Sequence, residues 1–479
     1  MMASTSPQDA SLKEQLRAKF VSQTLQQVPT PSVVLDLAKL TTNCERMLDA
    51  TDRLGLLWRP HIKTHKTIEL TRLQVGDERK TPVSLITSTI KEAENVLPLL
   101  QEYQCKGRHV NLLFSFPLFP SAAARLAHFS SQLGPGSLSV MIDHPDQLNT
   151  VADITSKSGN PPLIFIKIDA GYGRAGVVPG SASYTDLLDA VLAAEKQGIY
   201  ILHGLYCHAG QTYGLRGDWA AMDYLAAEFA EVIGAAALVR SKSPDHPLVL
   251  SVGATPTATS IQHPLFFSEE DMAKDRGMGP IKQIGGLFDE AKQAGYALEV
   301  HAGVYPTLDL QQLSTHARDS SLMTADDIAI SVLAEVASVY PSRGANGTTE
   351  ALIAAGSLAL GREPVADKGI VPGQDYSGWG FVAPWGGEGL VVKQPAPGPN
   401  FPRVHEGWQV GRISQEHGIL VWQGAREAEV PLRIGQRVRV WPNHACIAGA
   451  GFDWYLVVDS RNKGREDEVV DVWPRWRGW

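Results

Sequence analysis

Lys63 is the first residue of the sequence whose type and position could do chemistry. It lies in Trp58-Arg-Pro-His-Ile-Lys-Thr-His-Lys66, at the end of an apolar run. A lysine in a semi-buried site has a lowered pKa and can attack a carbonyl compound as a nucleophile. A basic turn on the protein surface would account for the same residues. The spacing alone therefore leaves both interpretations of Lys63 open.

Two later apolar runs also end in side chains that could bind a ligand. Asp169-Ala-Gly-Tyr-Gly-Arg-Ala-Gly176 contains Arg174, whose guanidinium fits an anionic oxygen, and its glycines allow close backbone approach. The segment His203-Gly-Leu-Tyr-Cys-His-Ala-Gly-Gln-Thr-Tyr213 brings His208 and Gln211 to the end of a run. Glycine-rich turns and structural histidines are common, so neither motif is specific by itself.

Glycines and hydroxyl groups follow two further runs. These are Ser251-Val-Gly-Ala-Thr-Pro-Thr257 and Glu299-Val-His-Ala-Gly-Val-Tyr305. Barrels commonly bind phosphate through backbone N–H groups after their late strands. Each segment could be a simple turn. Five polar endings in chain order nevertheless favour one shared ligand site.

His444 and Cys446 form a pair of a different kind, in Trp441-Pro-Asn-His-Ala-Cys446. On an extended segment, residues two apart point the same way. An imidazole and a thiolate together suit Zn²⁺, with the remaining positions left to water or substrate. A buried thiol beside a turn histidine is the simpler alternative.

The elements that would position these residues predict an α/β fold with two domains after a short arm. Apolar runs separated by helical segments are typical of a (β/α)₈ TIM barrel, which we place at 29–325. The nine runs are 32–37, 56–63, 83–87, 110–116, 138–143, 163–169, 200–208, 248–253 and 298–304. Residues 1–28 are expected to form an arm, 326–479 an antiparallel β domain, and 263–282 a loop between barrel strands.

Composition excludes several classes of protein. The 479 residues are 44% hydrophobic and 20% charged, values of an ordinary globular chain. The net charge of −8 argues against a nucleic-acid or anionic-membrane surface. No apolar stretch reaches the roughly 18 residues of a membrane span, and the N-terminus resembles no secretory signal. Four scattered cysteines suit a reducing interior, so a cytoplasmic protein is expected.

Together these motifs resemble the fold-type III pyridoxal phosphate enzymes, the alanine racemase-like class. The resemblance is closest to the eukaryotic, zinc-dependent D-serine dehydratases, and it runs from Thr30 to Asp459 with all motifs in the family's order. It implies that Lys63, and not Lys66, joins the cofactor covalently. It also implies that His444 and Cys446 bind zinc. The cofactor contacts implied are His61, Arg174, His208, Gln211, Tyr213, Gly253, Thr255, Glu299, His301, Gly303, Val304 and Tyr305.

One position departs from the racemases, which place an arginine near the pyridine nitrogen. Glu299 and His301 stand there in this chain, on the same face of a strand. Either could serve, and the two would affect protonation of the ring differently. The sequence leaves this choice open.

The resemblance implies β-elimination of D-serine to pyruvate and ammonia, and it leaves open whether D-threonine is a second substrate. Lys63 would be the base at Cα, and zinc would act as a Lewis acid on the substrate hydroxyl. The alternative within the class is a D-threonine aldolase, although those relatives carry an aspartate at the position of Cys446. An amino-acid racemase has no use for the metal pair, and a non-catalytic pyridoxal phosphate carrier would not need the β domain. The resemblance also implies a homodimer.

Overall fold

The computed structural model describes residues 7–267, 278–319, 321–365, 378–385 and 407–479. They form two compact units. The first contains 45–303 and 476–479, and the second contains 7–44 and 304–475, within the described ranges. The chain therefore enters the second unit, leaves it to build the first, and then returns.

The first unit is a parallel eight-stranded barrel, as predicted. Its sheet order is β2-β9-β8-β7-β6-β5-β4-β3, and hydrogen bonds of Ile86 with Pro60 and Ile62 join β3 to the segment after β2. Apolar residues fill the strands, as in the wholly buried β5, which is why buried parallel strands read as continuous apolar runs. The strands are β2 (Leu57–Trp58), β3 (Val83–Thr87), β4 (Val110–Pro117), β5 (Leu138–Ile142), β6 (Leu163–Ile168), β7 (Ile201–Cys207), β8 (Val249–Val252) and β9 (Ala297–Val300).

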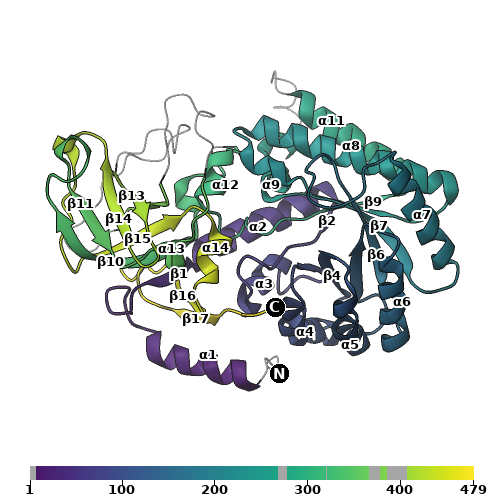
Figure 1. Cartoon of the computed structure of the whole chain (residues 1–479), viewed down its shortest axis with the longest axis horizontal. Coiled ribbons are helices and arrows are strands. Elements are labelled where there is room, and N and C mark those ends of the chain that lie inside the picture. Colours follow the sequence, from purple (N-terminus) through teal and green to yellow (C-terminus); the bar gives the residue numbers. More distant parts are fainter. Residues whose placement is uncertain (1–6, 268–277, 320, 366–377, 386–406) are drawn as a thin grey trace. The chain divides into compact units, whose positions relative to one another are not determined.

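Helices lie outside these strands (Figure 1). They are α3 (Ile68–Val75), α4 (Ile90–Cys105), α5 (Ala123–Leu133), α6 (Gln147–Ser158), α7 (Ala182–Glu195), α8 (Asp218–Lys242), α9 (Thr255–Ser260) and α11 (Met278–Gln293), with short 3₁₀ turns at Pro120–Ala122, Gly210–Gly214 and Pro264–Phe267. Helix α2 (Leu37–Leu54) begins in the second unit and ends in the first. The predicted loop 263–282 is wrong in its last part, because 278–282 is the first turn of α11, while 268–277 lies outside the described residues.

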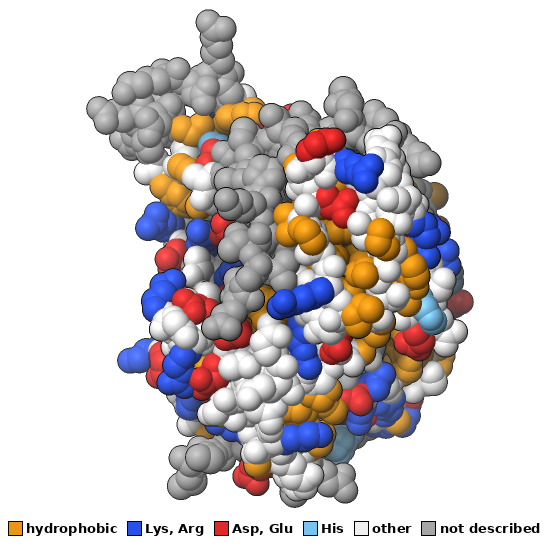
Figure 2. Space-filling model, turned by 90° about the vertical axis from the view of Figure 1, so that its left-hand side faces the viewer, with side chains coloured by type: hydrophobic (Ala, Val, Ile, Leu, Met, Phe, Trp, Pro, Cys, Tyr) orange, Lys and Arg blue, Asp and Glu red, His pale blue; other side chains and the backbone are white. Residues whose placement is uncertain are grey.

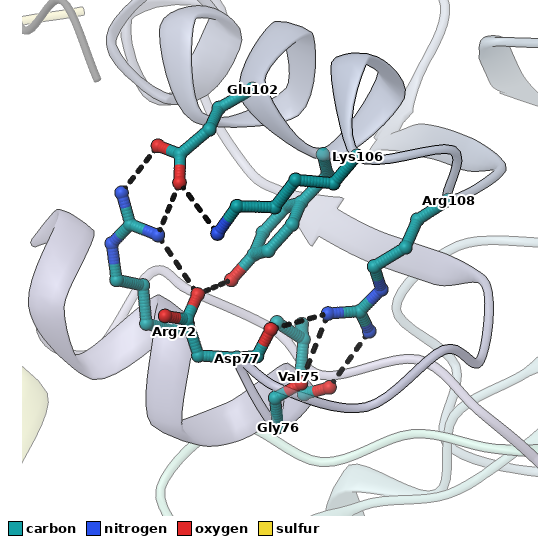
Figure 3. Close-up of polar contacts among 8 residues, drawn as sticks. Arg72, Val75, Gly76, Asp77, Glu102, Lys106 and Arg108 are labelled. Carbon is teal, nitrogen blue, oxygen red and sulfur yellow. Dashed lines mark hydrogen bonds and ion pairs between the residues drawn. The ribbon is translucent and has the colours of Figure 1, made fainter. Parts of the chain in front are cut away.

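A polar network holds α3, the helix that follows Lys63, against α4 (Figure 3). Arg72 of α3 bonds Asp77 at 2.8 Å and Glu102 of α4 at 2.5 Å. Arg108 donates to the carbonyl oxygens of Val75 and Gly76, both at 3.0 Å, where α3 ends. These bonds satisfy carbonyl groups that a helix end leaves unpaired, and they fix the far end of the segment that carries the lysine.

The second unit is a nine-stranded sheet in the order β11-β14-β13-β12-β15-β10-β1-β16-β17. Neighbouring strands are antiparallel, as predicted, except for the parallel pair β1 and β16. The strands are β1 (Ser32–Asp36), β10 (Ile330–Tyr340), β11 (Glu350–Ile353), β12 (Gly380–Val382), β13 (Gly407–Ile413), β14 (Gly418–Gln423), β15 (Arg437–Pro442), β16 (Trp454–Val458) and β17 (Asp471–Pro474). Its helices are α1 (Pro7–Phe20), α12 (Leu310–Thr315), α13 (Ser357–Leu360) and α14 (Ala445–Ala450), and its 3₁₀ turns are Ala325–Asp327, Ala345–Gly347 and Arg426–Ala428.

The run 32–37 was expected among the barrel strands, and that assignment is wrong. Val34 of β1 pairs with Ser331 of β10 and Leu456 of β16, both in the second unit. An apolar run indicates a buried strand but not the sheet that contains it. The compact units accordingly divide the chain at other points than the predicted limits 28/29 and 325/326.

The N-terminal arm is part of a core and not a free extension. Leu16 and Phe20 of α1, with Leu25 and Val28, pack on residues of β1, β10, β16 and β17. None of the helices in the described ranges is both long and apolar enough to cross a bilayer.

Candidate active site at the barrel strand ends

Lys63 lies in the turn between β2 and α3, and its side chain is half-buried. Its backbone N–H donates to Nδ1 of His61 at 3.3 Å. Lys66, three residues on, forms an ion pair with the buried Glu92, with Nζ 3.0 Å from Oε1. That pair commits the Lys66 ammonium to a structural role. Of the two lysines, Lys66 is therefore the one already held by a buried carboxylate.

Three histidines come together near Lys63 from the ends of three strands. His61 Nε2 bonds Ser88 Oγ at 3.0 Å, and His208 Nδ1–H donates to the Gly253 carbonyl at 2.8 Å. His301 Nδ1 bonds Ser251 Oγ at 3.0 Å, and its ring centroid lies 6.2 Å from that of His208. Among the described residues, His301 Nε2 is buried and has no hydrogen-bond partner. An acceptor or donor on a ligand would satisfy it.

These imidazoles are neutral at physiological pH. Burial lowers the pKa of His61, His208 and His301 well below the usual value. The positive charge of Lys63 lowers the pKa of His61 and His208 further. Burial also lowers the pKa of His203, deeper in the barrel, to about 4.

We expect this cluster to make the protein acid-sensitive. The unfolded chain binds protons at these histidines below about pH 6.5, whereas the folded barrel does not, so stability falls as pH falls through that value. Each histidine contributes up to about 1.4 kcal/mol per pH unit. The urea midpoint should therefore drop steeply from pH 7.5 to pH 5.5. His203→Phe should reduce that drop, and His144→Gln, at an exposed site, should not. Equal drops in all three proteins would contradict this expectation.

Glu299 is committed to a buried ion pair. Its Oε1 accepts from Arg59 Nε at 2.7 Å, and both side chains are almost fully buried. Arg59 also donates to Asn111 Oδ1 at 2.7 Å. Releasing Glu299 to a ligand would leave a buried charge unpaired, which is costly. Of the two candidates for the pyridine nitrogen, His301 is the one with a ring atom that has no hydrogen-bond partner in the described ranges.

Arg174 lies in an exposed loop after β6. The side chain of Asp169, at the start of this loop, holds the loop backbone in place. The Asp169 carboxylate accepts backbone N–H groups of Gly171, Tyr172 and Gly173 within 3.1 Å. The Tyr172 ring lies 6.3 Å from the His208 ring, and the Arg174 guanidinium lies over Tyr172 at 5.0 Å. This loop therefore brings Arg174 to the neighbourhood of His208.

Gln211 and Tyr213 lie in the 3₁₀ turn after β7, and both are half-buried. Gln211 Nε2 donates weakly to the Ala170 carbonyl at 3.5 Å, and its Oε1 is buried without a partner in the part of the chain that is described. Like His301, Gln211 thus offers an unused polar atom.

Gly253, Thr255 and Gly303 meet where β8 and β9 end. The Gly303 N–H donates to Thr255 Oγ1 at 3.4 Å. Gly253 has φ +141°, and a Cβ there would lie 2.3 Å from the His301 carbonyl oxygen, so glycine is required. Val304 and Tyr305 follow directly but belong to the second unit, where both are buried.

The candidate metal ligands lie in the second unit, in an arrangement that differs from the predicted one. His444 occupies the N-cap position of the short helix α14 and Cys446 is in its first turn, so the segment is not extended. A side-chain hydrogen bond with Cys446 raises the pKa of His444 to about 9, against the opposing effect of burial. His444 Nδ1 is buried and has no hydrogen-bond partner among the described residues. Asp309 accepts the Ala445 N–H at 2.8 Å and so holds the start of this helix.

Sequence reasoning missed Lys167, Tyr206 and Asp309. Lys167 lies in β6, 6% exposed, with Nζ 4.4 Å from the Tyr206 ring centroid. Burial lowers its pKa to about 8. Tyr206 stacks on His301 with centroids 4.1 Å apart. A single lysine inside the apolar run LIFIKI was a usable signal, whereas nothing local marked Tyr206 or Asp309.

Comparisons with known proteins cover both units. Residues 35–272 match the alanine racemase N-terminal domain, and 329–458 match the serine dehydratase domain. The D-serine dehydratase of Schizosaccharomyces pombe is 37% identical over 98% of this chain and 96% of its own. That of Saccharomyces cerevisiae is 30% identical over 94% and 96%.

A solved structure agrees with these matches. The D-threo-3-hydroxyaspartate dehydratase of Delftia sp. HT23 superposes with a TM-score of 0.70 at 27% identity, over 95% of this chain and all of that one. A cysteine-to-alanine mutant of that enzyme is known in a metal-free form. The chain therefore belongs to the D-serine dehydratase family of lyases, built on the alanine racemase-like fold.

Proposed function

We propose that this protein is a pyridoxal phosphate- and zinc-dependent D-serine dehydratase, which converts D-serine to pyruvate and ammonia. The observation that carries this proposal is the 37% identity to a D-serine dehydratase over 98% of the chain. That match includes both the lysine turn of the barrel and the His–Cys pair of the second unit.

The residues at the barrel strand ends fit pyridoxal phosphate. Bound there, the cofactor would supply an electron sink for the charge left at the substrate Cα. Lys63 would hold its aldehyde carbon, and His301, whose Nε2 has no partner among the described residues, would be the candidate to hold the ring nitrogen. Thr255 and the backbone of Gly253, Gly303 and Val304 would hold the phosphate. Arg174, His208, Gln211, His61, Tyr213 and Tyr305 are the further proposed contacts.

The Lys63 amine would then move the reacting proton. Once free, it would take the Cα proton of D-serine from one face, which gives the choice between D and L substrates. Neutral His61 and His208 favour this role, because they place no additional positive charge beside a developing ammonium group. The half-buried position of Lys63 keeps the amine partly away from water.

His444 and Cys446 fit zinc, since imidazole and thiolate are its common ligands and one ring nitrogen of His444 is buried without a partner in the described ranges. Zinc would supply a Lewis acid for the substrate hydroxyl oxygen. The metal-free form of a cysteine mutant of the Delftia enzyme supports metal binding in this family. Asp309 would keep the two side chains in place through its bond to Ala445.

One set of assays tests the proposal. D-serine, D-threonine and their L-forms are incubated with the protein, with and without chelator, and products are identified. We expect pyruvate from D-serine, formed only without chelator, and no product from L-serine. Glycine and acetaldehyde from D-threonine would favour the aldolase instead. No turnover of D-serine with zinc present would favour a cofactor carrier.

We further propose a cytoplasmic homodimer without nucleic-acid or membrane partners. The four free cysteines support a reducing compartment, and the dimer rests on the resemblance alone. Basic and acidic side chains are interspersed over the described part of the face in Figure 2, so this part has no extended basic surface of the kind that binds nucleic acid. Light scattering of the purified protein tests the dimer.

A further inference from the structure

A buried carboxylate, Glu228, lies beneath the loops that follow β7 and β8. It is part of α8 and only 2% exposed. Its Oε1 accepts the Ala209 N–H at 3.0 Å, and its Oε2 accepts the Thr257 hydroxyl at 2.7 Å. The Gly253 N–H donates to it as well. A single side chain thus joins the segment after β7 to the segment after β8.

Those segments carry the proposed cofactor contacts. Ala209 follows His208, and the His208 imidazole donates to the carbonyl of Gly253 at 2.8 Å. Glu228 therefore closes a ring of bonds around the His208–Gly253 contact. The Thr257 hydroxyl also accepts the Ala254 N–H at 3.0 Å, so its own proton is available for Glu228. Thr255 lies between Ala254 and Thr257 in the chain, so the same bonds also fix its position.

Burying a charge at this place is costly, and the packing of helix α8 does not require a charged residue there. Met222, Leu225, Phe229 and Val232 of α8 are fully buried apolar residues. Burial raises the pKa of Glu228 to about 7, and hydrogen bonds from Thr257, Ala209 and Gly253 oppose that rise. All three partners are donors. A carboxylate, which only accepts, satisfies them together, and an apolar side chain would leave three buried donors unpaired.

We propose that Glu228 is a positioning residue for the phosphate end of the cofactor, acting through the loops of Ala209, Gly253 and Thr257. This inference rests on the proposed use of pyridoxal phosphate. It makes Glu228 more important for binding the phosphate than for binding the aldehyde and ring, which Lys63 and His301 would hold.

Glu228→Gln tests the proposal, because the amide of glutamine accepts hydrogen bonds at its oxygen only. Its NH₂ group would then face at least one of the three groups that donate to the carboxylate. The full-length protein is dialysed to equilibrium against pyridoxal phosphate and, separately, against pyridoxal, which lacks the phosphate. We expect the dissociation constant for pyridoxal phosphate to rise at least about tenfold, as for loss of a charged hydrogen bond, and that for pyridoxal to rise much less.

Two further variants complete the experiment. Tyr184→Phe removes another buried hydrogen bond to α8, from its hydroxyl to the Ala235 carbonyl at 2.7 Å, and should leave both constants unchanged. Thr257→Val removes a single donor to Glu228 and should act in the same direction as Glu228→Gln. It also serves if the glutamine variant does not fold.

Several outcomes would overturn the inference. Equal losses of affinity for both ligands in Glu228→Gln and Thr257→Val would indicate general damage to the fold, and no loss in either would show that the loops do not depend on Glu228. Failure of the unchanged protein to bind pyridoxal phosphate would instead contradict the proposed function.

Discussion

Lys63→Ala should reduce pyruvate formation from D-serine by about 1,000-fold or more, because it removes both the covalent anchor and the base. It should also abolish the absorbance near ~420 nm that pyridoxal phosphate shows when joined to a lysine amine. Absorbance spectra of the purified variant and a coupled pyruvate assay measure the two effects.

Lys66→Ala is the matched control. Lys66 lies in the same turn, but its ammonium pairs with Glu92 at 3.0 Å. This variant should lose stability because Glu92 is left buried without its cation, and it should keep the ~420 nm absorbance. Persistence of that absorbance in Lys63→Ala, or its loss only in Lys66→Ala, would show that the wrong lysine has been assigned.

His444→Ala should keep the cofactor spectrum and lose elimination. A Lewis acid contributes several kcal/mol at the departing oxygen, so we expect turnover of D-serine to fall by about 100-fold or more. Zinc content, measured by elemental analysis, should fall with it. Chelator should have the same effect on the unchanged protein.

Two cysteine variants sharpen this experiment. Cys446→Ser should lower zinc content, whereas Cys105→Ser, at an exposed position in the barrel unit, should not. Full activity of His444→Ala without bound zinc would overturn the Lewis-acid assignment.

The barrel could be predicted because its signal is local. Eight of the nine apolar runs became its strands, since a strand buried on both faces must be apolar at consecutive positions. The ninth run, now β1, carries the same signal but pairs with β10 and β16. Partner choice depends on residues far away in the chain, and no single segment encodes it.

The candidate site could be predicted where a sequence motif was specific. It was less predictable where contacts between distant residues determine which side chains are available to a ligand. The turn containing Lys63 could be recognised from its sequence motif. Only the structure shows that Lys66 and Glu299 are held in ion pairs with other side chains. The separation of His444 and Cys446 suggested an extended segment, whereas the bond from Ala445 to Asp309 starts a helix there. Glu228 was missed, since in sequence it is one acidic residue of a long helix.

Strand β1 also bears on the order in which the protein folds during synthesis. All eight barrel strands are synthesised before β10 (Ile330–Tyr340) and β16 (Trp454–Val458), the two neighbours of β1. The barrel can therefore form first, while Ser32–Asp36 waits with both edges unpaired. A nascent chain in that state exposes an apolar strand with two open edges, either of which could pair with another chain.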